Sequence, residues 1–419
     1  MSRITVGIVG GGASGMMAAI TAARQGAAVT LIEGSSRLGK KLLSTGNGKC
    51  NLGNLKLDVS DYYTGQPERL GAFLKKFDTQ DVISFFQGIG VILKEKNGYL
   101  YPACEQAAVI QDALRYELRA LQVQELTEWK VDAVARDKET GRIAVRSGDR
   151  ELLFDRVILA CGGQAAPKTG SDGSGYLLAQ QMGHSLVPVV PALVQLKCRE
   201  DYLRSVAGVR TDAQISVYRD GECVAVERGE LQLTEYGLSG IPVFQLSRVV
   251  NYILRDQKEV ELSVDFLPDY NPEEFEQLCL SRELLLQGER TLEEFFTGML
   301  HKKLMVMFIK LAGFKTSEII NSIDRKQLTK IYQLCRRWNV HANGSNSYDN
   351  AQVCAGGVPL KEVTDRLESV KQPGVFLAGE MLDVDGKCGG YNLHWAWCSG
   401  YLAAMAASAV DCSRSPADA

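Results

Sequence analysis

A glycine-rich turn near the start of the chain has the residue types and the spacing of a dinucleotide site. Gly10, Gly12 and Gly15 follow the pattern G-x-G-x-x-G directly after the apolar run 4–9. Glycine at these places permits a tight turn, a close approach of the backbone to a pyrophosphate, and close packing of a helix on a strand. Glu33 follows Gly15 by 18 residues, where its carboxylate would accept hydrogen bonds from ribose hydroxyls. These residues predict a site for the adenosine half of a dinucleotide.

Three predicted elements would position this turn. The β-branched run 4–9 is typical of a buried parallel strand, residues 13–25 have the composition of a helix, and residues 28–32 form a second strand. The helix would direct the unpaired N–H groups of Ala13 and Ser14, with the positive end of its dipole, at the phosphates. Because FAD and NAD sites share this pattern, other segments of the chain must indicate which of the two cofactors binds.

A second glycine-rich turn, residues 383–392, follows an apolar strand that ends at Glu380. A helix is predicted from Leu393 onward. Two-site FAD proteins need such a second anchor for the ribityl chain and the ring, whereas NAD-only dehydrogenases do not. Glu380 or Asp383 would bind the ribityl hydroxyls. Backbone N–H groups around Asn392 and Leu393 would face the pyrimidine edge of the flavin, where negative charge develops on reduction.

A third segment, residues 38–51, is a long basic loop punctuated by glycine. It follows the second strand directly, which would carry it across the cofactor. Lys40 and Lys41 in this loop, together with the dipole of the last helix, would stabilise negative charge on the reduced ring.

Three segments resemble a family of bacterial NAD(P)/FAD-dependent oxidoreductases. They read GKKLLSTGNGKCN at 39–51, AGGV at 355–358, and GE through NLHWAW at 379–397. Members of this family are variously described as aminoacetone oxidases or 3-dehydro-bile-acid reductases, and the resemblance covers the chain to about residue 408. Departures from the family pattern are Lys49 in place of arginine, Cys388 in place of threonine and His394 in place of glutamine.

The resemblance implies FAD, a Rossmann-type domain, an inserted β-rich domain and a helical domain. We therefore expect an α/β fold with a Rossmann-type two-site FAD-binding domain, an inserted antiparallel β domain and a helical domain. Alternating apolar residues from about 194 and a turn at 219–222 support the β insert, and a capping box at Thr291 opens a helical pattern that continues to Leu300. The expected ranges are 1–188 with 353–408 for the FAD domain, 189–268 for the insert, 269–352 for the helical domain and return segment, and 409–419 for a disordered tail.

The predicted cofactor site also includes the end of a strand at 155–159 and the strand-like stretch before it. Small residues after that strand would lie against the nucleotide, and the backbone of Val131 would contact the adenine. The complete set is Gly10, Gly12, Ala13, Ser14, Gly15, Glu33, Gly34, Lys40, Lys41, Leu42, Thr45, Gly46, Asn47, Cys50, Asn51, Val131, Ala160, Gly162, Gly379, Glu380, Asp383, Gly390, Asn392 and Leu393.

The sequence does not decide which reaction the flavin carries out. The chain has one G-x-G-x-x-G and no second one, so NADPH or NADH would have to visit the flavin transiently. We expect a reductase of an enone-like or steroid-like small molecule. The alternatives are an oxidase that passes electrons from a small amine such as aminoacetone to O₂, and a flavin redox sensor without turnover. A reductase needs a proton donor, for which His394, Tyr391 and Cys388 are candidates by location.

Composition excludes several other classes of protein. A net charge of −3 and the lack of a basic stripe argue against a nucleic-acid partner, and thus against an RNA-directed flavoprotein. No apolar stretch reaches the ~18 residues of a membrane span. The eleven cysteines form no C-x-x-C pair, and with four histidines they predict neither a metal site nor a disulfide framework. We expect a cytoplasmic protein of undetermined oligomeric state.

Overall fold

The computed structural model describes residues 3–286 and 288–409. Its internal contacts divide the chain into two units, Met1–Val190 with Ala351–Ala419, and Pro191–Asn350. These boundaries differ by two residues from those expected at 188 and 353. The predicted disordered tail lies, apart from Ala409, outside the described residues.

The first unit is built on a five-stranded sheet in the order β20-β11-β1-β2-β7. All of its strand pairs are parallel, and β1 lies between β11 and β2. Its strands are β1 (Thr5–Val9), β2 (Ala28–Ile32), β7 (Gln124–Leu126), β11 (Arg156–Leu159) and β20 (Val375–Leu377). Because β20 comes from the far end of the sequence, the two ends of the chain meet in one sheet, as a Rossmann-type FAD domain requires. The predicted fold class is confirmed in this respect.

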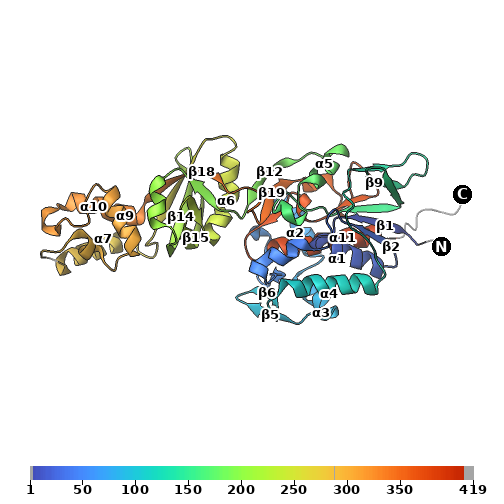
Figure 1. Cartoon of the computed structure of the whole chain (residues 1–419), viewed down its shortest axis with the longest axis horizontal. Coiled ribbons are helices and arrows are strands. Elements are labelled where there is room, and N and C mark those ends of the chain that lie inside the picture. Colours follow the sequence, from blue (N-terminus) through green and yellow to red (C-terminus); the bar gives the residue numbers. More distant parts are fainter. Residues whose placement is uncertain (1–2, 287, 410–419) are drawn as a thin grey trace. The chain divides into compact units, whose positions relative to one another are not determined.

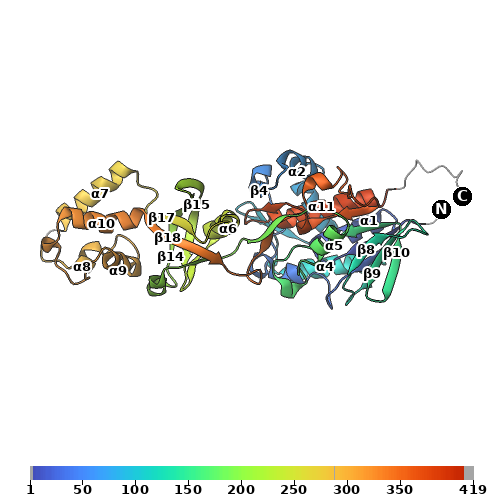
Figure 2. The ribbon, with the colours of Figure 1, turned by 90° about the horizontal axis from the view of Figure 1, so that it is seen from above.

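Two helices from opposite ends of the chain lie side by side next to this sheet (Figures 1 and 2). Helix α1 (Ala13–Arg24) follows β1, and helix α11 (Tyr391–Ala407) is the last described helix. A Cβ atom on Gly400 would lie 2.3 Å from the carbonyl oxygen of Ser14, so only glycine permits this contact. The close approach brings the first turns of both helices to the carboxyl end of the sheet, where open α/β folds bind their ligands.

The remaining elements of the first unit surround the sheet and the helix pair. The helices are α2 (Pro67–Leu74), α3 (Thr79–Gly88), α4 (Ala107–Ala120) and α5 (Ser174–Gln181). The short strands are β3 (Gly53–Asn54), β4 (Tyr62–Tyr63), β5 (Leu93–Lys96), β6 (Tyr99–Pro102), β8 (Ala133–Arg136), β9 (Ile143–Ser147), β10 (Arg150–Phe154), β12 (Val187–Ala192), β19 (Val353–Gly357) and β21 (Asp385–Gly386).

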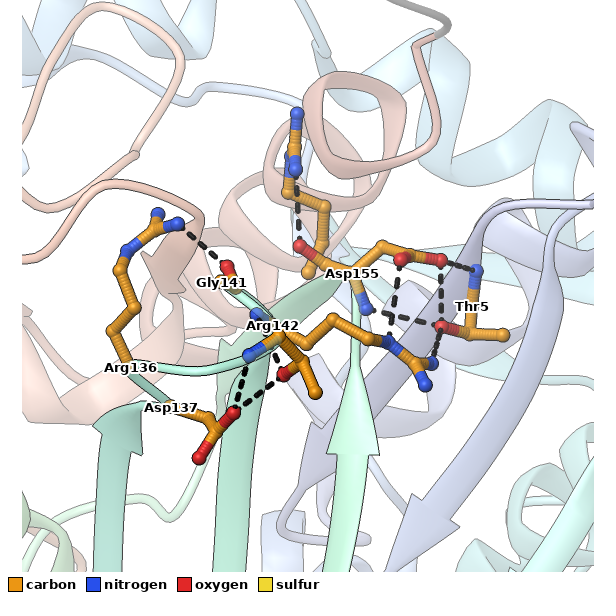
Figure 3. Close-up of polar contacts among 8 residues, drawn as sticks. Thr5, Arg136, Asp137, Gly141, Arg142 and Asp155 are labelled. Carbon is orange, nitrogen blue, oxygen red and sulfur yellow. Dashed lines mark hydrogen bonds and ion pairs between the residues drawn. The ribbon is translucent and has the colours of Figure 1, made fainter. Parts of the chain in front are cut away.

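A polar cluster connects strands β8–β10 to the amino-terminal end of the sheet (Figure 3). The Thr5 N–H and hydroxyl donate to Asp155 Oδ2 at 2.8 and 2.7 Å, and Arg142 donates to the hydroxyl of Thr5 at 2.9 Å. Burial raises the pKa of Asp155, but the hydrogen bonds from Thr5 and the charges of Arg142 and Arg156 outweigh it, so the net shift is downward. This cluster stabilises the end of the sheet opposite the predicted site.

The second unit contains a closed barrel in the order β13-β16-β15-β14-β17-β18, with helix α6 (Ile241–Ile253). The turn between its two longest strands has positive φ at Asp220 and Gly221, as the predicted hairpin requires. The strand that closes the barrel, β18, comes from the return segment expected after the helical domain. It pairs with both β13 and β17, the strands that would otherwise be the two open edges of the sheet. The strands are β13 (Leu196–Cys198), β14 (Arg210–Arg219), β15 (Glu222–Leu233), β16 (Gly237–Ser239), β17 (Val260–Asp265) and β18 (Trp338–Ser345).

Four helices follow β17 in the second unit, and Figure 2 shows them gathered beyond the barrel strands. They are α7 (Pro272–Leu285), α8 (Leu292–Phe296), α9 (Lys302–Leu311) and α10 (Arg325–Arg336). Thr291 caps α8 as predicted, in a capping box with Glu294. Helix α8 ends at Phe296 and not at Leu300, since Gly298 takes a positive φ of 84°. Among the described residues, no helix has the length and apolar character needed to cross a membrane.

Candidate functional site

A cleft of about 940 Å³, open solvent at its mouth included, lies in the first unit at the carboxyl end of the sheet. Its main lining segments are the G-x-G-x-x-G turn, the loop 37–45, the end of β11 and the start of α11, and shorter pieces come from 169–171, 352–353, Glu33, Glu380 and Val384. A second hollow of about 700 Å³ shares Gly10, Glu33, Cys161 and Gly170 with the cleft. The site therefore continues from the helix pair past the end of β2, which suits an extended ligand.

The amino-terminal turn of α1 faces this cleft without a side-chain cap. Its N-cap is Gly12, no side chain accepts from the first turn, and no acidic residue stands in that turn. A Cβ atom on Gly12 would meet nothing within 4 Å on the protein side, whereas one on Gly15 would lie 1.8 Å from the carbonyl oxygen of Gly10. The helix thus packs closely and presents its N–H groups and dipole to the cleft, as an anion site requires.

Glu33 is fixed at the junction of the two hollows. Its Oε2 accepts from Gly11 N and its Oε1 from Ser35 N, both at 2.7 Å. These bonds orient the carboxylate at the carboxyl end of β2, where it lines both hollows. Gly34 and Val131 line the second hollow, so the residues predicted for the ribose and the adenine lie together.

The first turn of α11 is the second uncapped helix end at the cleft. Gly390 is its N-cap with a φ of 93°, and no side chain caps the turn. The amide of Asn392 accepts from Gly386 N and donates to Gly386 O, both at 2.8 Å. Asn392 therefore stabilises the preceding turn with its side chain while it lines the cleft with Leu393.

An ion pair crosses the cleft between the basic loop and the second turn. Lys41 Nζ lies 2.8 Å from Glu380 Oε2, and Glu380 Oε1 accepts from Cys354 N at 2.8 Å. Lys40 also lines the cleft, and among the described residues it makes no ion pair. The loop and the acid predicted for the ribityl chain are thus neighbours, although 339 residues separate Lys41 from Glu380 in sequence.

The residues present fit FAD. Two uncapped helix ends face one cleft, a Cβ-free space lies at Gly12, and an oriented carboxylate, Glu33, stands between the cleft and the adenosine hollow. The α1 end and the open space at Gly12 would bind the pyrophosphate, the α11 end would face the flavin ring, and Glu33 would bind the ribose.

A family model for the HI0933-like protein Rossmann domain matches residues 4–406. This chain belongs to that family. It is an FAD-dependent oxidoreductase, in agreement with the resemblance found in the sequence.

Two relatives and one solved structure are similar to this chain over nearly its whole length. The chain is 43% identical to a 3-dehydro-bile acid delta(4,6)-reductase of Clostridium scindens, over 97% of this chain and 99% of the relative. It is 30% identical to a ribosomal RNA dihydrouridine synthase of Escherichia coli, over 97% and 98%. A 3-ketosteroid delta1-dehydrogenase from Sterolibacterium denitrificans, at 12% identity and a TM-score of 0.51, covers 97% of this chain and 100% of its own, and confirms the fold.

Eight residues of the predicted set line neither the cleft nor the second hollow, so their contact with the cofactor stays a prediction. Cys50 is buried, and burial raises the pKa of its thiol to about 12. The Asn51 amide donates to Gly53 O at 2.8 Å and accepts from Gly390 N at 3.3 Å. Asp383 is buried and accepts from Gly65 N at 3.3 Å. The eight residues are Gly15, Gly46, Asn47, Cys50, Asn51, Gly379, Asp383 and Gly390.

The three candidate proton donors do not line the cleft or the adenosine hollow. His394 is fully buried, with Nε2 3.2 Å from the carbonyl oxygen of Phe77. Burial lowers its pKa to about 4, although the Phe77 carbonyl opposes this shift. The Tyr391 hydroxyl accepts from Asn54 at 3.1 Å, and burial raises its pKa to about 12. Cys388 is partly exposed in the turn before α11. The structure brings none of them to the cleft wall, and their catalytic role stays a prediction.

Several lining residues are absent from the sequence-based set. Arg37 immediately precedes the basic loop, Gln352 precedes the AGGV segment, and Gly170 and Ser171 belong to the glycine-rich loop 169–175. The only sequence signal for these residues was their position next to segments already predicted to bind the cofactor. Among the described residues, no group of His, Cys, Asp or Glu side chains could hold a metal ion.

Replacing Gly12 by alanine tests the phosphate site. The backbone at Gly12 has φ −80° and ψ −164°, which alanine adopts freely, and its Cβ would touch no protein atom. We expect a protein of wild-type thermal stability in the apo form whose FAD affinity falls at least about tenfold, because the methyl group occupies the space next to the pyrophosphate. Flavin fluorescence titration measures the affinity. Gly88→Ala, which also meets no atom within 4 Å, should bind FAD normally. Equal affinity in both variants would contradict the assignment.

The buried His394 predicts a pH dependence of stability. An unfolded histidine has a pKa near 6.5, so between about pH 6.5 and 4 the unfolded chain binds a proton that the folded chain excludes. The free energy of unfolding should therefore fall by up to roughly 3 kcal/mol as the pH drops through this window. Urea denaturation at a series of pH values measures it, and His394→Gln should lose this component. Parallel curves for the two proteins would contradict it.

Proposed function

We propose that this chain is an NAD(P)H-dependent flavin reductase that saturates a carbon–carbon double bond conjugated to a ketone in an enone-like or steroid-like small molecule of the bile-acid type. The observation that carries the proposal is the 43% identity, over 97% of this chain, to a relative named for this reaction on a 3-dehydro bile acid. The proposed place of action is the cytoplasm.

The chemistry divides between the cofactor and the chain. FAD, when bound, supplies the hydride transfer. The uncapped first turn of α11 at Asn392 and Leu393 would stabilise negative charge on the pyrimidine edge through its N–H groups and dipole. Lys40, which lines the cleft without an ion pair among the described residues, would add a positive charge, whereas Glu380 largely balances the charge of Lys41 at 2.8 Å. These groups favour the electron-rich form of the cofactor, and so ease its reduction.

The electron donor would use the same cleft as the substrate. The chain carries one G-x-G-x-x-G, which the adenosine half of FAD would occupy, so NADPH or NADH has no dinucleotide module of its own in this sequence. A donor that leaves before the substrate enters gives a ping-pong sequence with two half-reactions, which can be measured apart.

A second candidate function is the reduction of a uridine in ribosomal RNA. The relative of Escherichia coli named for dihydrouridine synthesis covers the same 97% of this chain, at 30% identity. The double bond that becomes saturated in dihydrouridine is also conjugated to a carbonyl group. Both candidate reactions therefore reduce a carbon–carbon double bond that is conjugated to a carbonyl group. They differ in the substrate, which is a small molecule in one case and an RNA chain in the other.

An anaerobic titration tests the reductase proposal. NADPH or NADH added to the holoenzyme should bleach the flavin absorption band, and a 3-oxo-Δ4 steroid added next should restore it without oxygen. Buffer without steroid is the control. A band that persists with both nucleotides but bleaches with aminoacetone would favour the oxidase. A band that bleaches but returns with no acceptor except O₂ would contradict the enone reductase.

A further inference from the structure

Two tyrosines on strand β6 form a partly exposed aromatic surface in the first unit. The three-stranded sheet β3-β6-β5 presents Tyr99 and Tyr101 on one face, while Leu100 and Pro102 between and beyond them are buried on the other. Both tyrosines are partly exposed. Aromatic rings two residues apart on a strand form a flat surface with both an apolar face and polar edges, which suits a ring-shaped ligand.

This surface lies beside Gly46 and Gly389, which do not line the cleft themselves but belong to the two segments that lead into its wall. A Cβ atom on Gly46, in the basic loop, would lie 3.7 Å from the ring of Tyr101. One on Gly389, just before the first turn of α11, would lie 2.8 Å from the ring of Tyr99. The two rings therefore lie between the loop that contributes Lys41 and Thr45 to the cleft wall and the turn that leads into α11.

Lysines flank the two rings. Lys96 pairs with Tyr99 across the ladder and Lys94 with Tyr101, so all four side chains share one face. The stem of Lys56 passes 3.8 Å from a Cβ position on Gly98, beside Tyr99.

Two acids partly offset this charge. Glu95 Oε1 accepts from Gly98 N at 2.5 Å in the hairpin turn. Glu105 forms ion pairs with Lys94 at 2.5 Å and with Lys49 at 2.7 Å. Lys56 and Lys96 form no ion pair within the described part of the chain, and both are exposed. The surface thus has two tyrosine rings, two lysines without an ion pair among the described residues, and the Glu95 carboxylate bound to the hairpin turn.

We propose that this surface, the tyrosine shelf of Tyr99, Tyr101, Lys56 and Lys96, binds a ring-bearing substrate that carries an anionic group away from the bond to be reduced. The rings would contact the body of the substrate, and the two lysines would pair with its carboxylate. This inference rests on the proposed function, since it names the substrate class of the same site. The occupant that we assign is a steroid acid, whose side-chain carboxylate lies away from the bond to be reduced.

The test uses oxidised FAD holoenzyme and follows the flavin absorption band, so it does not depend on turnover. The probes are a 3-oxo-Δ4 steroid with a side-chain carboxylate and its methyl ester. At low salt the acid should bind roughly five- to tenfold tighter than the ester, as two exposed ion pairs would give, and the difference should vanish at high salt. The double variant Lys56→Glu, Lys96→Glu should lose the preference. Lys138→Glu, an exposed lysine of the β8–β9 turn, should retain it.

Two further arms complete the design. Tyr99→Leu should weaken acid and ester binding alike, because it removes a ring and leaves the charges. A short single-stranded oligouridine RNA should compete with the steroid acid, in a manner that depends on Lys56 and Lys96, if phosphate is the natural anion. A steroid-acid preference that depends on these lysines supports the shelf, whereas RNA binding in its place would overturn the assignment of a steroid acid.

Binding of acid, ester and RNA that is equal in wild type and in the lysine double variant would overturn the shelf, as would no binding of any probe. Bleaching of the same holoenzyme by NADPH and its reoxidation by a neutral enone would show that the proposed reductase stands when the shelf fails.

Discussion

The close approach of α1 and α11 is the constraint on which the site depends. A Cβ on Gly400 would meet the Ser14 carbonyl at 2.3 Å, and a Cβ on Gly15 would meet the Gly10 carbonyl at 1.8 Å. With glycine at both points, two helix amino termini from opposite ends of the chain reach one cleft. Each leaves its first-turn N–H groups without a side-chain cap. A ligand with negative charge at two separated places would accept hydrogen bonds from both helix ends.

Much of the cofactor site was predictable because its signals are local. A β-branched run, a glycine turn and an acid at the end of the next strand define the adenosine half, and the structure brings Gly12, Glu33 and Val131 to the two hollows. The Asp220-Gly221 hairpin and the Thr291 capping box are equally local and were found for the same reason. Each of these follows from the preferences of a few adjacent residues.

Other features depend on contacts between distant segments and carry no local signal. The strand β18 closes the barrel although it follows a run of helices, because pairing with β13 and β17 decides its place. His394 stands one residue after Leu393, which lines the cleft, yet the helix turns its ring into the core. Its position near the turn predicted a catalytic histidine. Each helical residue is rotated by about 100° from the one before it. Which of the two neighbouring side chains then faces the cleft depends on how α11 packs, and this packing directs His394 to Phe77.

The most direct test of the account is the identity and amount of the bound cofactor. The protein is purified without added flavin, denatured, and the released cofactor is separated by chromatography and quantified against protein concentration. The account predicts FAD at one molecule per chain, since one cleft serves both helix ends. FMN in its place, or no flavin even after incubation with FAD, would contradict the assignment of the cleft.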